Sequence, residues 1–378
     1  MHNHRHPIHC IVPPHMLNNI ATHGTENQRN LAISTLKVSE QMRGQRRALS
    51  DFTAAAFRVA AVGGGKERIV YDAKNGSTLP GTAVRNEGDP ASADVAVNEA
   101  YDGSGVTYDL YKNVYDRNSI DNNGMRLDST VHYRRDYDNA FWNGEQMVYG
   151  DGDGELFNRF TIAIDVIGHE LTHGVTQFEA KLVYSQQPGA LNESMSDVFG
   201  SLVKQYQKGQ TADQADWIIG EGLFTSSVNG VGIRSMKAPG TAYDDPVLGK
   251  DPQPAHMKDY VNTSSDNGGV HINSGIPNHA FYLVANLIGG HAWEKTGQIW
   301  YVTLRDKLTS SSNFQQCANQ TFQVAGALFG AGSLEQQAVK SGWAEVGLDV
   351  EGGGTPTPTP GDGCIGSLLK LIGAAPAK

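Results

Sequence analysis

The sequence predicts an α+β protein with two domains, a β-rich domain followed by a mainly α-helical one, with a cleft between them. Residues 51–163 are rich in Gly, Asp and Asn and contain short alternating runs such as Arg68–Asp72, a pattern typical of twisted β-structure with many turns. From residue 164 to residue 348, apolar residues recur with helical spacing. A Gly/Thr/Pro stretch at 352–361 indicates a linker, so residues 349–378 are expected to form a linker and a short tail.

Composition restricts the classes of function. The chain has 378 residues, 39% of them hydrophobic, which is enough for two domains with a sizeable core. A net charge of −10 argues against nucleic acid as a partner. The sequence has no run of 18 or more apolar residues, so we expect no membrane span. The three cysteines offer no disulfide framework, and Cys317 is expected to be a core thiol. We expect a monomer.

The most informative motif is His169-Glu170-Leu171-Thr172-His173. Histidines four residues apart share one face of a helix and can bind one zinc ion, while the intervening Glu170 can accept a proton from a water molecule at that ion. Apolar residues on both sides predict a buried helix of about 15 residues, in which unpaired polar groups are costly. The alternative is a surface helix that carries two unrelated histidines.

A second helical segment, residues 189–200, supplies the other groups that such a site needs. Glu193 is the expected third zinc ligand, which leaves one position open, as in catalytic zinc sites. Asp197 lies four residues later on the same face and can accept the outer N–H of one ligand histidine. Asn192 can do the same for the other histidine. The alternative is a solvated acidic helix face.

Together these motifs resemble those of the thermolysin-type zinc endopeptidases, or gluzincins. Residues 139–144 and 147–152 are similar to the edge strand that binds the substrate backbone in that family, and residues 266–275 to the segment with its transition-state histidine. The resemblance runs from about residue 51 to residue 348. It implies the two-domain gluzincin fold, one catalytic zinc ion, and protein or peptide substrates that are cut at internal bonds.

The resemblance also assigns roles to individual residues. Glu170 would be the general base, and Tyr184 and His271 would donate hydrogen bonds to the oxyanion, with His271 oriented by Asp266. Arg234 would bind the substrate carbonyl beyond the cut, and the backbone of Asn139 and Ala140 would pair with the extended peptide. A bulky hydrophobic side chain after the cut would enter a pocket lined by four apolar residues, for which the alternative is plain core packing: Phe157, Phe160, Val166 and Ile233.

Calcium is where the sequence departs from the family pattern. Asp165, Asp216 and Glu221 match the carboxylates that hold a pair of calcium ions in relatives. Lys204 and Ile218, however, stand where two further acids are expected. Calcium requires about six or more oxygen ligands, several of them anionic, so we expect one calcium ion or none.

Residues 1–50 resemble the short propeptide of the protealysin-like branch, through Pro13-Pro14 followed by Met16 and Leu17. We expect this segment to cover the cleft and inhibit the enzyme within the same chain, until self-processing near residue 50 at the basic stretch 43–50. One hypothesis is that Cys10 or a histidine of the N-terminal tract binds the zinc ion in the precursor.

The remaining expectations concern location and the competing function. Residues 1–50 lack the apolar region of a classical signal peptide, so secretion would need another route, and the alternative is a cytoplasmic protein. The competing function is a catalytically silent zinc- or peptide-binding protein on the same fold. An aminopeptidase lacks support because the chain has no motif that would bind a free amine.

Overall fold

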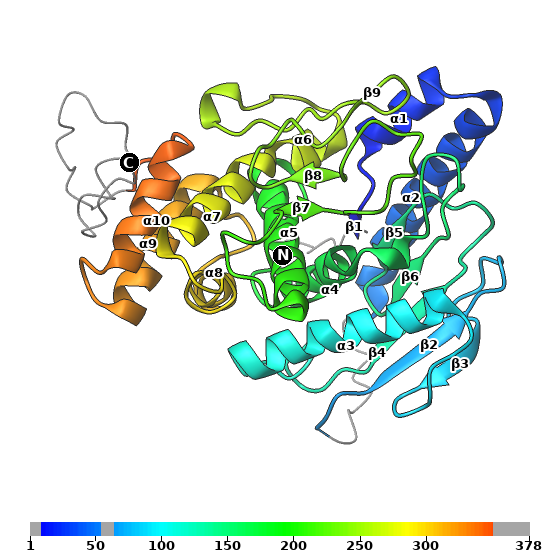
Figure 1. Cartoon of the computed structure of the whole chain (residues 1–378), viewed down its shortest axis with the longest axis horizontal. Coiled ribbons are helices and arrows are strands. Elements are labelled where there is room, and N and C mark those ends of the chain that lie inside the picture. Colours follow the sequence, from blue (N-terminus) through cyan, green and yellow to red (C-terminus); the bar gives the residue numbers. More distant parts are fainter. Residues whose placement is uncertain (1–8, 54–63, 351–378) are drawn as a thin grey trace.

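The computed structural model describes residues 9–53 and 64–350, and the side chains of residues 10–39 and 64–350. The expected linker and tail, and most of the N-terminal histidine tract, lie outside these ranges. The described residues form a β-rich region and a helical region that pack side by side, with an N-terminal helical pair against the β-rich region (Figure 1). The predicted α+β class is confirmed.

The N-terminal part consists of strand β1 (His9–Cys10) and helices α1 (Pro14–His23) and α2 (Glu26–Thr53). Pro14 is the first residue of α1, where its missing N–H leaves no intrahelical bond unmade. Apolar side chains of α1 are buried at Met16, Leu17 and Ile20, with helical spacing. This part therefore docks on the rest of the molecule through one apolar face.

A six-stranded mixed sheet forms the β-rich region, in the order β1-β5-β6-β4-β2-β3. Its other strands are β2 (Arg68–Asp72), β3 (Thr82–Asn86), β4 (Leu127–Val131), β5 (Ala140–Trp142) and β6 (Met147–Tyr149). The strand that was expected to bind substrate, β5, pairs on one side with β6 and on the other with β1 of the N-terminal part. Its free edge is thus already covered by the chain itself.

A long helix in the β-rich region, α3 (Val95–Tyr115), was not predicted. Its middle carries Gly103 and Gly105, which lower helix propensity and hide the apolar spacing. Neighbouring side chains fill the space beside these glycines, since a Cβ at Gly103 would lie 2.4 Å from Ile167 and one at Gly105 2.2 Å from Arg68. Asp94 caps the helix by accepting a hydrogen bond from the Ala96 N–H. Tertiary packing therefore decides this helix.

Helices dominate from residue 164 onward: α4 (Ile164–Phe178), α5 (Gln186–Lys208), α6 (Asp266–Asn273), α7 (Gly275–Ile288), α8 (Lys295–Asp306), α9 (Phe314–Phe329) and α10 (Leu334–Glu345). The 15-residue α4 confirms the buried helix predicted around His169. Two short hairpins connect α5 to α6, β7 (Ile218–Ile219) with β8 (Arg234–Ser235) and β9 (Asp244–Asp245) with β10 (Gly249–Lys250). Short 3₁₀ turns cover Phe160–Ile162 and Met257–Asp259.

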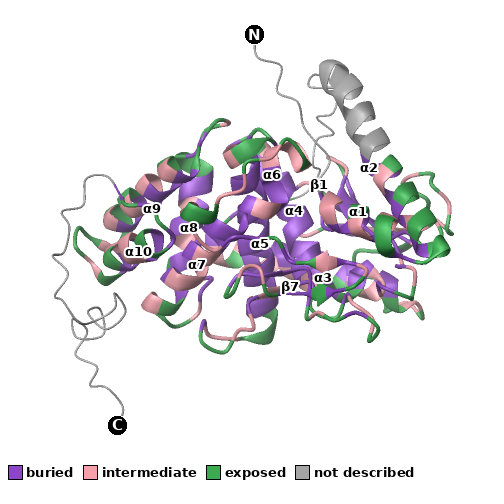
Figure 2. Ribbon diagram, turned by 90° about the horizontal axis from the view of Figure 1, so that it is seen from above, coloured by how far each residue is buried: buried purple, intermediate pink, exposed green. Residues whose placement is uncertain are grey.

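Helices α4 and α5 run through the centre of the molecule and are buried over most of their length (Figure 2). One apolar cluster extends from the sheet through these helices to α10, and it includes Ile11, Val12 and Met16 of the N-terminal part. Cys317 lies inside it, fully buried, as predicted. Among the described residues no helix is long and apolar enough to cross a membrane. The domain boundaries at residues 50, 163 and 348 stay predictions.

Candidate metal centre

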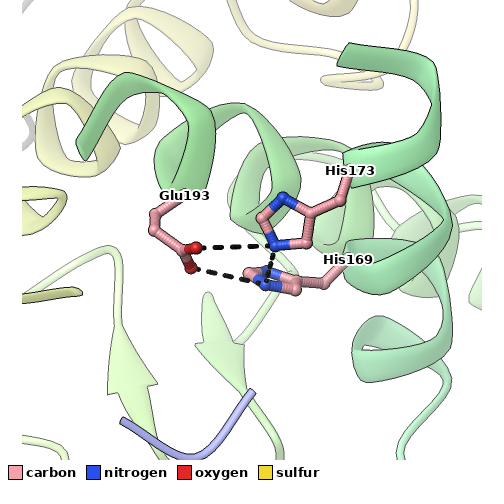
Figure 3. Close-up of side chains that lie close together, drawn as sticks. All are labelled: His169, His173 and Glu193. Atoms are coloured by element: carbon pink, nitrogen blue, oxygen red, sulfur yellow. Dashed lines mark hydrogen bonds and ion pairs between the residues drawn. The ribbon is translucent and has the colours of Figure 1, made fainter. Parts of the chain in front are cut away.

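His169 and His173 project from one face of α4 toward Glu193 on α5 (Figure 3). The two Nε2 atoms are 3.0 Å apart, and each lies 3.5 Å from a carboxylate oxygen of Glu193. A tetrahedral ion with bonds of about 2.1 Å places its ligand atoms about 3.4 Å apart, so these separations fit zinc. The side chains are completely buried or nearly so.

The outer nitrogens of both histidines have partners that fix the direction of the inner ones. His169 Nδ1 lies 2.8 Å from Asp197 Oδ1, which can only accept, and His173 Nδ1 lies 2.9 Å from Asn192 Oδ1. Each Nδ1 therefore carries the proton, and each Nε2 directs a lone pair at the other. Two facing lone pairs beside a carboxylate are three Lewis bases that a dication satisfies, so the residues present fit zinc.

Asp197 connects this centre to more distant parts of the chain. Its two oxygens accept hydrogen bonds from Arg234 Nε and Nη2, both at 2.8 Å, and Oδ2 also accepts one from Asn278 at 2.8 Å. Burial alone would raise the pKa of Asp197, but the charges of Arg234 and His169 outweigh burial and hold this pKa below its usual range. Asp197 therefore stays ionised and fixes the orientation of His169.

Glu170, the expected general base, is fully buried next to the metal-binding side chains. Its Oε2 accepts a hydrogen bond from the Trp142 N–H of β5 at 2.9 Å, while Oε1 has no hydrogen-bond partner among the described residues. Burial, and then the charge of Glu193, raise the pKa of Glu170 well above its ordinary value. A carboxylate with one fixed oxygen and one available oxygen of raised basicity suits proton transfer.

Tyr184 and His271 both contact Glu193. The Tyr184 hydroxyl donates to Glu193 Oε1 and lies 3.1 Å from His271 Nε2. Asp266 holds His271 through both its Nδ1 at 2.7 Å and its backbone N–H at 2.8 Å. Burial would lower the pKa of His271, but Asp266 and Glu193 outweigh burial and raise this pKa. His271 is thus held as a hydrogen-bond donor aimed at the centre.

The tight hold of Asp266 on His271 depends on local backbone geometry. Asn267, Gly268 and Gly269 all have φ between 52° and 90°, which puts a kink in α6 between Asp266 and His271. Two of the three are glycines, the residue that adopts this conformation without strain.

The N-terminal segment lies across this centre as an extended chain. Antiparallel pairing of β1 with β5 continues beyond the strand, where Ile11 N–H donates to the Ala140 carbonyl at 3.3 Å. Val12 N–H donates to Asn139 Oδ1 at 3.0 Å, and Arg234 Nη1 donates to the Ile11 carbonyl at 3.2 Å. The Ala140 backbone and Arg234, two groups that the sequence assigned to substrate binding, therefore bind the protein's own N-terminal segment. Asn139 binds it as well, but through its side chain and not through the backbone that the sequence assigned.

Cys10 does not join the metal-binding group. Its thiol donates to Ser39 Oγ at 3.6 Å, and its side chain packs with Val38 of α2 and with Tyr133 and Tyr137. The group of His, Cys, Asp and Glu side chains that could hold a metal in the described residues contains His169, His173 and Glu193, without Cys10. The hypothesis that the Cys10 thiolate binds the zinc ion is wrong for this structure; the side chain of His9 lies outside the described set.

The expected pocket residues Phe157, Phe160, Val166 and Ile233 are all buried in the main apolar cluster, together with Ile11. The rings of Phe157 and Phe160 lie 5.7 Å apart. This surrounding accepts an aliphatic or aromatic group and would leave a charged one without a partner.

The candidate calcium cluster lies at the start of α4, and a lysine lies within it. Lys204 Nζ is 2.9 Å from Asp165, 2.8 Å from Asp216 and 4.0 Å from Glu221, and it also donates to the Ile218 carbonyl at 2.6 Å. Burial would lower the pKa of Lys204, but Asp165 and Asp216 outweigh burial and raise this pKa. The Lys204 ammonium thus lies among the oxygens that a calcium ion would contact.

Comparison with known proteins agrees with this geometry. Residues 24–177 match the catalytic domain of the thermolysin metallopeptidases, and residues 180–348 match their α-helical domain. The chain belongs to the thermolysin metallopeptidase family. It is 52% identical to an extracellular metalloprotease of Pectobacterium carotovorum, over 91% of this chain and 97% of that protein. It is 49% identical to protease PrtS of Photorhabdus, over 90% and 92%.

Among solved structures, the precursor of protealysin from Serratia proteamaculans superimposes with a TM-score of 0.82 at 55% identity, and the match covers 90% of this chain and 99% of that one. A thermolysin of Alicyclobacillus acidocaldarius, by contrast, matches 74% of this chain and 50% of its own length. The chain is therefore a thermolysin-like zinc metalloendopeptidase of the protealysin-like branch.

Three elements of the site were missed by sequence reasoning. They are the Trp142 N–H on Glu170, the Ser196 hydroxyl 2.9 Å from His173 Nδ1, and Asn278 on Asp197. Ser196 lies on the same helix as Asn192 and Glu193, so helical spacing could have identified it. The other two come from elements whose position relative to α4 no local pattern reveals.

Proposed function

We propose that this chain is the latent precursor of a neutral zinc endopeptidase that prefers a bulky hydrophobic residue on the C-terminal side of the cut. The observation that carries the proposal is the pair of facing histidine lone pairs beside Glu193, with the buried Glu170 next to them. The proposed domains are a propeptide at 1–50, a β-rich peptidase domain at 51–163, a helical peptidase domain at 164–348, and a linker with a tail at 349–378.

In the proposed mechanism each residue acts on a defined atom. A bound zinc ion would polarise the scissile carbonyl and lower the pKa of the attacking water. Glu170 Oε1 takes the proton from that water and then passes it to the leaving amine, while the Trp142 N–H keeps the other oxygen fixed. Tyr184 and His271 donate hydrogen bonds to the developing oxyanion, each lowering the barrier by about 3 kcal/mol.

The position of the N-terminal segment supports the proposed specificity. If Arg234 binds the carbonyl of the residue after the cut, then Ile11 occupies that residue's place and the Cys10–Ile11 bond lies where the scissile bond would lie. Ile11 is fully buried and belongs to the same large apolar cluster as the four pocket residues. A β-branched aliphatic residue in this position agrees with a preference for bulky hydrophobic side chains.

The same contacts support inhibition by residues 1–50 within the chain. The strand that we propose to bind substrate is paired with β1, and Glu170, Tyr184 and His271 are all buried in this form of the chain. A peptide substrate would have to displace this segment before it could pair with Ala140. We therefore propose that removal of residues 1–50 activates the enzyme.

The proposed processing stretch 43–50 lies within helix α2. Because substrates of this site bind as extended strands, the stretch must unwind before it can be cut, which slows cleavage in the folded precursor. We propose self-processing near residue 50 and action outside the cell, in keeping with the extracellular relatives. No proposed role requires a second metal ion: Lys204 supports a count of no calcium.

The function is tested with a blocked peptide that has Leu or Phe after the cut, given to the processed protein with and without a zinc chelator. We expect hydrolysis that the chelator abolishes and zinc restores, and at least about 100-fold slower hydrolysis when Asp follows the cut. Glu170→Gln is the control that keeps the zinc ligands. A processed protein that holds zinc but leaves the peptide intact would support the silent zinc-binding alternative instead.

Latency is tested in the full-length chain. Ile11→Asp places a charge in the apolar surroundings of that residue, so we expect the unprocessed variant to hydrolyse the blocked peptide where the unprocessed wild type does not. For self-processing, a Glu170→Ala precursor purified alone should stay uncut near residue 50. Cleavage of that variant at the same place would show that another peptidase removes the segment.

A further inference from the structure

His15 is the second residue of α1 and lies four residues after Ile11, whose carbonyl Arg234 holds. Its Nε2 is 3.0 Å from the Tyr243 hydroxyl, a contact between the N-terminal part and the helical region. Its Nδ1 is buried and has no hydrogen-bond partner among the described residues. A neutral imidazole needs one donor and one acceptor, whereas an imidazolium has two N–H groups to satisfy. The surroundings of His15 therefore satisfy the neutral form better.

Three charged or titratable groups face His15: Arg234 and His271 oppose a positive charge on it, whereas Asp266 favours one. From the peptidase side they are Arg234 of β8, and His271 and Asp266 of α6. Asp266 is the one carboxylate among them, but both of its oxygens already bind His271. Tyr243 is buried and neutral, since burial and then the charge of Asp251 raise its pKa.

The helix that carries His15 also disfavours protonation of its side chain. The N-terminus of a helix has a partial positive charge, and α1 has no acidic residue in its first turn to offset it. Burial, the largest cause, lowers the pKa of His15 from 6.5 to about 4. Once the segment has left its site, His15 returns to solvent and to an ordinary pKa of about 6.5.

We propose that His15 makes the hold of the N-terminal segment on the active site sensitive to pH, so that the segment stays in place while His15 is neutral and is released when His15 takes up a proton. This inference rests on the proposed inhibitory role of residues 1–50 and adds the trigger that ends it. Slightly acidic surroundings would then expose the substrate-binding strand and allow processing.

The pH dependence of closure follows from the different pKa of His15 in the closed and open forms. A histidine whose pKa is depressed in the closed state stabilises closure fully above pH 6.5, and this contribution declines as the pH falls toward 4. With a His15 pKa of about 6.5 in the open form, the equilibrium constant for opening rises about 30-fold as the pH falls from 7.5 to 5.0. Other groups also titrate in this range, so the effect of His15 must be isolated by substitution.

The test is amide hydrogen exchange of residues 11–20 in the full-length, zinc-loaded Glu170→Gln precursor, which cannot cut itself. After correction for the intrinsic pH dependence of exchange, opening should increase between pH 7.5 and pH 5.0 about 30-fold more in this protein than in the same protein with His15→Gln. His23→Gln is the matched control, because His23 lies at the exposed other end of the same helix. That control should keep the full response.

An equal pH response with and without His15→Gln would overturn the proposal. His15→Leu, with the same measurement, replaces His15→Gln if the latter does not fold. A second readout is activity of the unprocessed wild-type chain toward a small blocked peptide, which should rise at pH 5.0 relative to the His15→Gln chain. Because hydrogen exchange reports closure without turnover, a failure of peptidase activity would leave the exchange result intact, and the two failures are distinguishable.

Discussion

Two clusters of acidic and basic side chains lie on the same pair of helices, α4 and α5, and they are built differently. The first combines His169 and His173 of α4 with Glu193 of α5, and its three ligand atoms face one another. The second combines Asp165 of α4 with Lys204 of α5, and in it a positive charge is already supplied by the chain. The first cluster therefore presents three ligand atoms to a metal ion, whereas the second is occupied by the Lys204 ammonium.

The comparison shows that acidic residues alone do not define a metal site. Asp165, Asp216 and Glu221 have the residue types of a calcium site, but the Lys204 ammonium lies among their oxygens at 2.8 to 4.0 Å. A buried ammonium with two carboxylate partners favours its protonated form, so we expect it to exclude a dication both by charge and by volume. The two clusters therefore differ in whether the protein places a positively charged side chain among the acidic ones.

The largest effect is expected from changing the first cluster. Glu193→Gln removes the anionic ligand, so we expect zinc content to fall and activity to decrease at least about 1,000-fold. Zinc content by mass spectrometry and hydrolysis of a blocked peptide measure both. Glu221→Gln, the same change in the second cluster, is the control and should leave both unchanged. Equal losses in the two variants would contradict the distinction between the clusters.

An intermediate effect is expected from the second cluster. Lys204→Met leaves Asp165 buried without its partner, so the free energy of unfolding should fall by about 3–5 kcal/mol. In wild type, added calcium should not change the thermal midpoint, whereas Lys204→Glu should make the midpoint rise with calcium concentration. Thermal unfolding with and without calcium measures this. A wild-type midpoint that depends on calcium would show that the ammonium does not replace the ion.

The smallest effect concerns a third place where a protein cation lies between carboxylates. His132 is 2.8 Å from both Asp94 and Asp151, and the hydrogen bond with Asp151, outweighing burial, raises the pKa of His132 to about 9. A histidine whose pKa is raised on folding stabilises the fold fully below pH 6.5, and this contribution is lost as the pH rises through 9. His132→Gln should reduce stability by about 1 kcal/mol at pH 6 and have little effect at pH 10.

Chemical denaturation of both proteins at the two pH values measures this difference. Lys204→Met provides the contrast, because the lysine that it removes stays charged over this range. Its loss of unfolding free energy should therefore be similar at pH 6 and pH 10. A His132→Gln cost that does not depend on pH would mean that the charge of His132 contributes nothing to stability.

Much of the site followed from local patterns because it lies on two helices with strict spacing. The four-residue separations of His169 from His173 and of Glu193 from Asp197 predicted the ligands and the carboxylate behind them. The unpredicted α3 had its apolar spacing interrupted by Gly103 and Gly105, which only the approach of Ile167 and Arg68 explains. The Trp142 N–H on Glu170 could not be predicted, since a backbone donor carries no sequence signal.

The sequence by itself determined the α+β class, the zinc-binding motif, the family and the substitution of Lys204 into the calcium cluster. These depend on residue identity and on spacing within one element. Only the tertiary structure decided that Cys10 contacts Ser39 and not the metal centre, that Arg234 holds the Ile11 carbonyl, and that His15 faces Arg234 and His271. Such contacts join residues more than 200 positions apart in two of these cases, and long-range packing brings them together where no local pattern could.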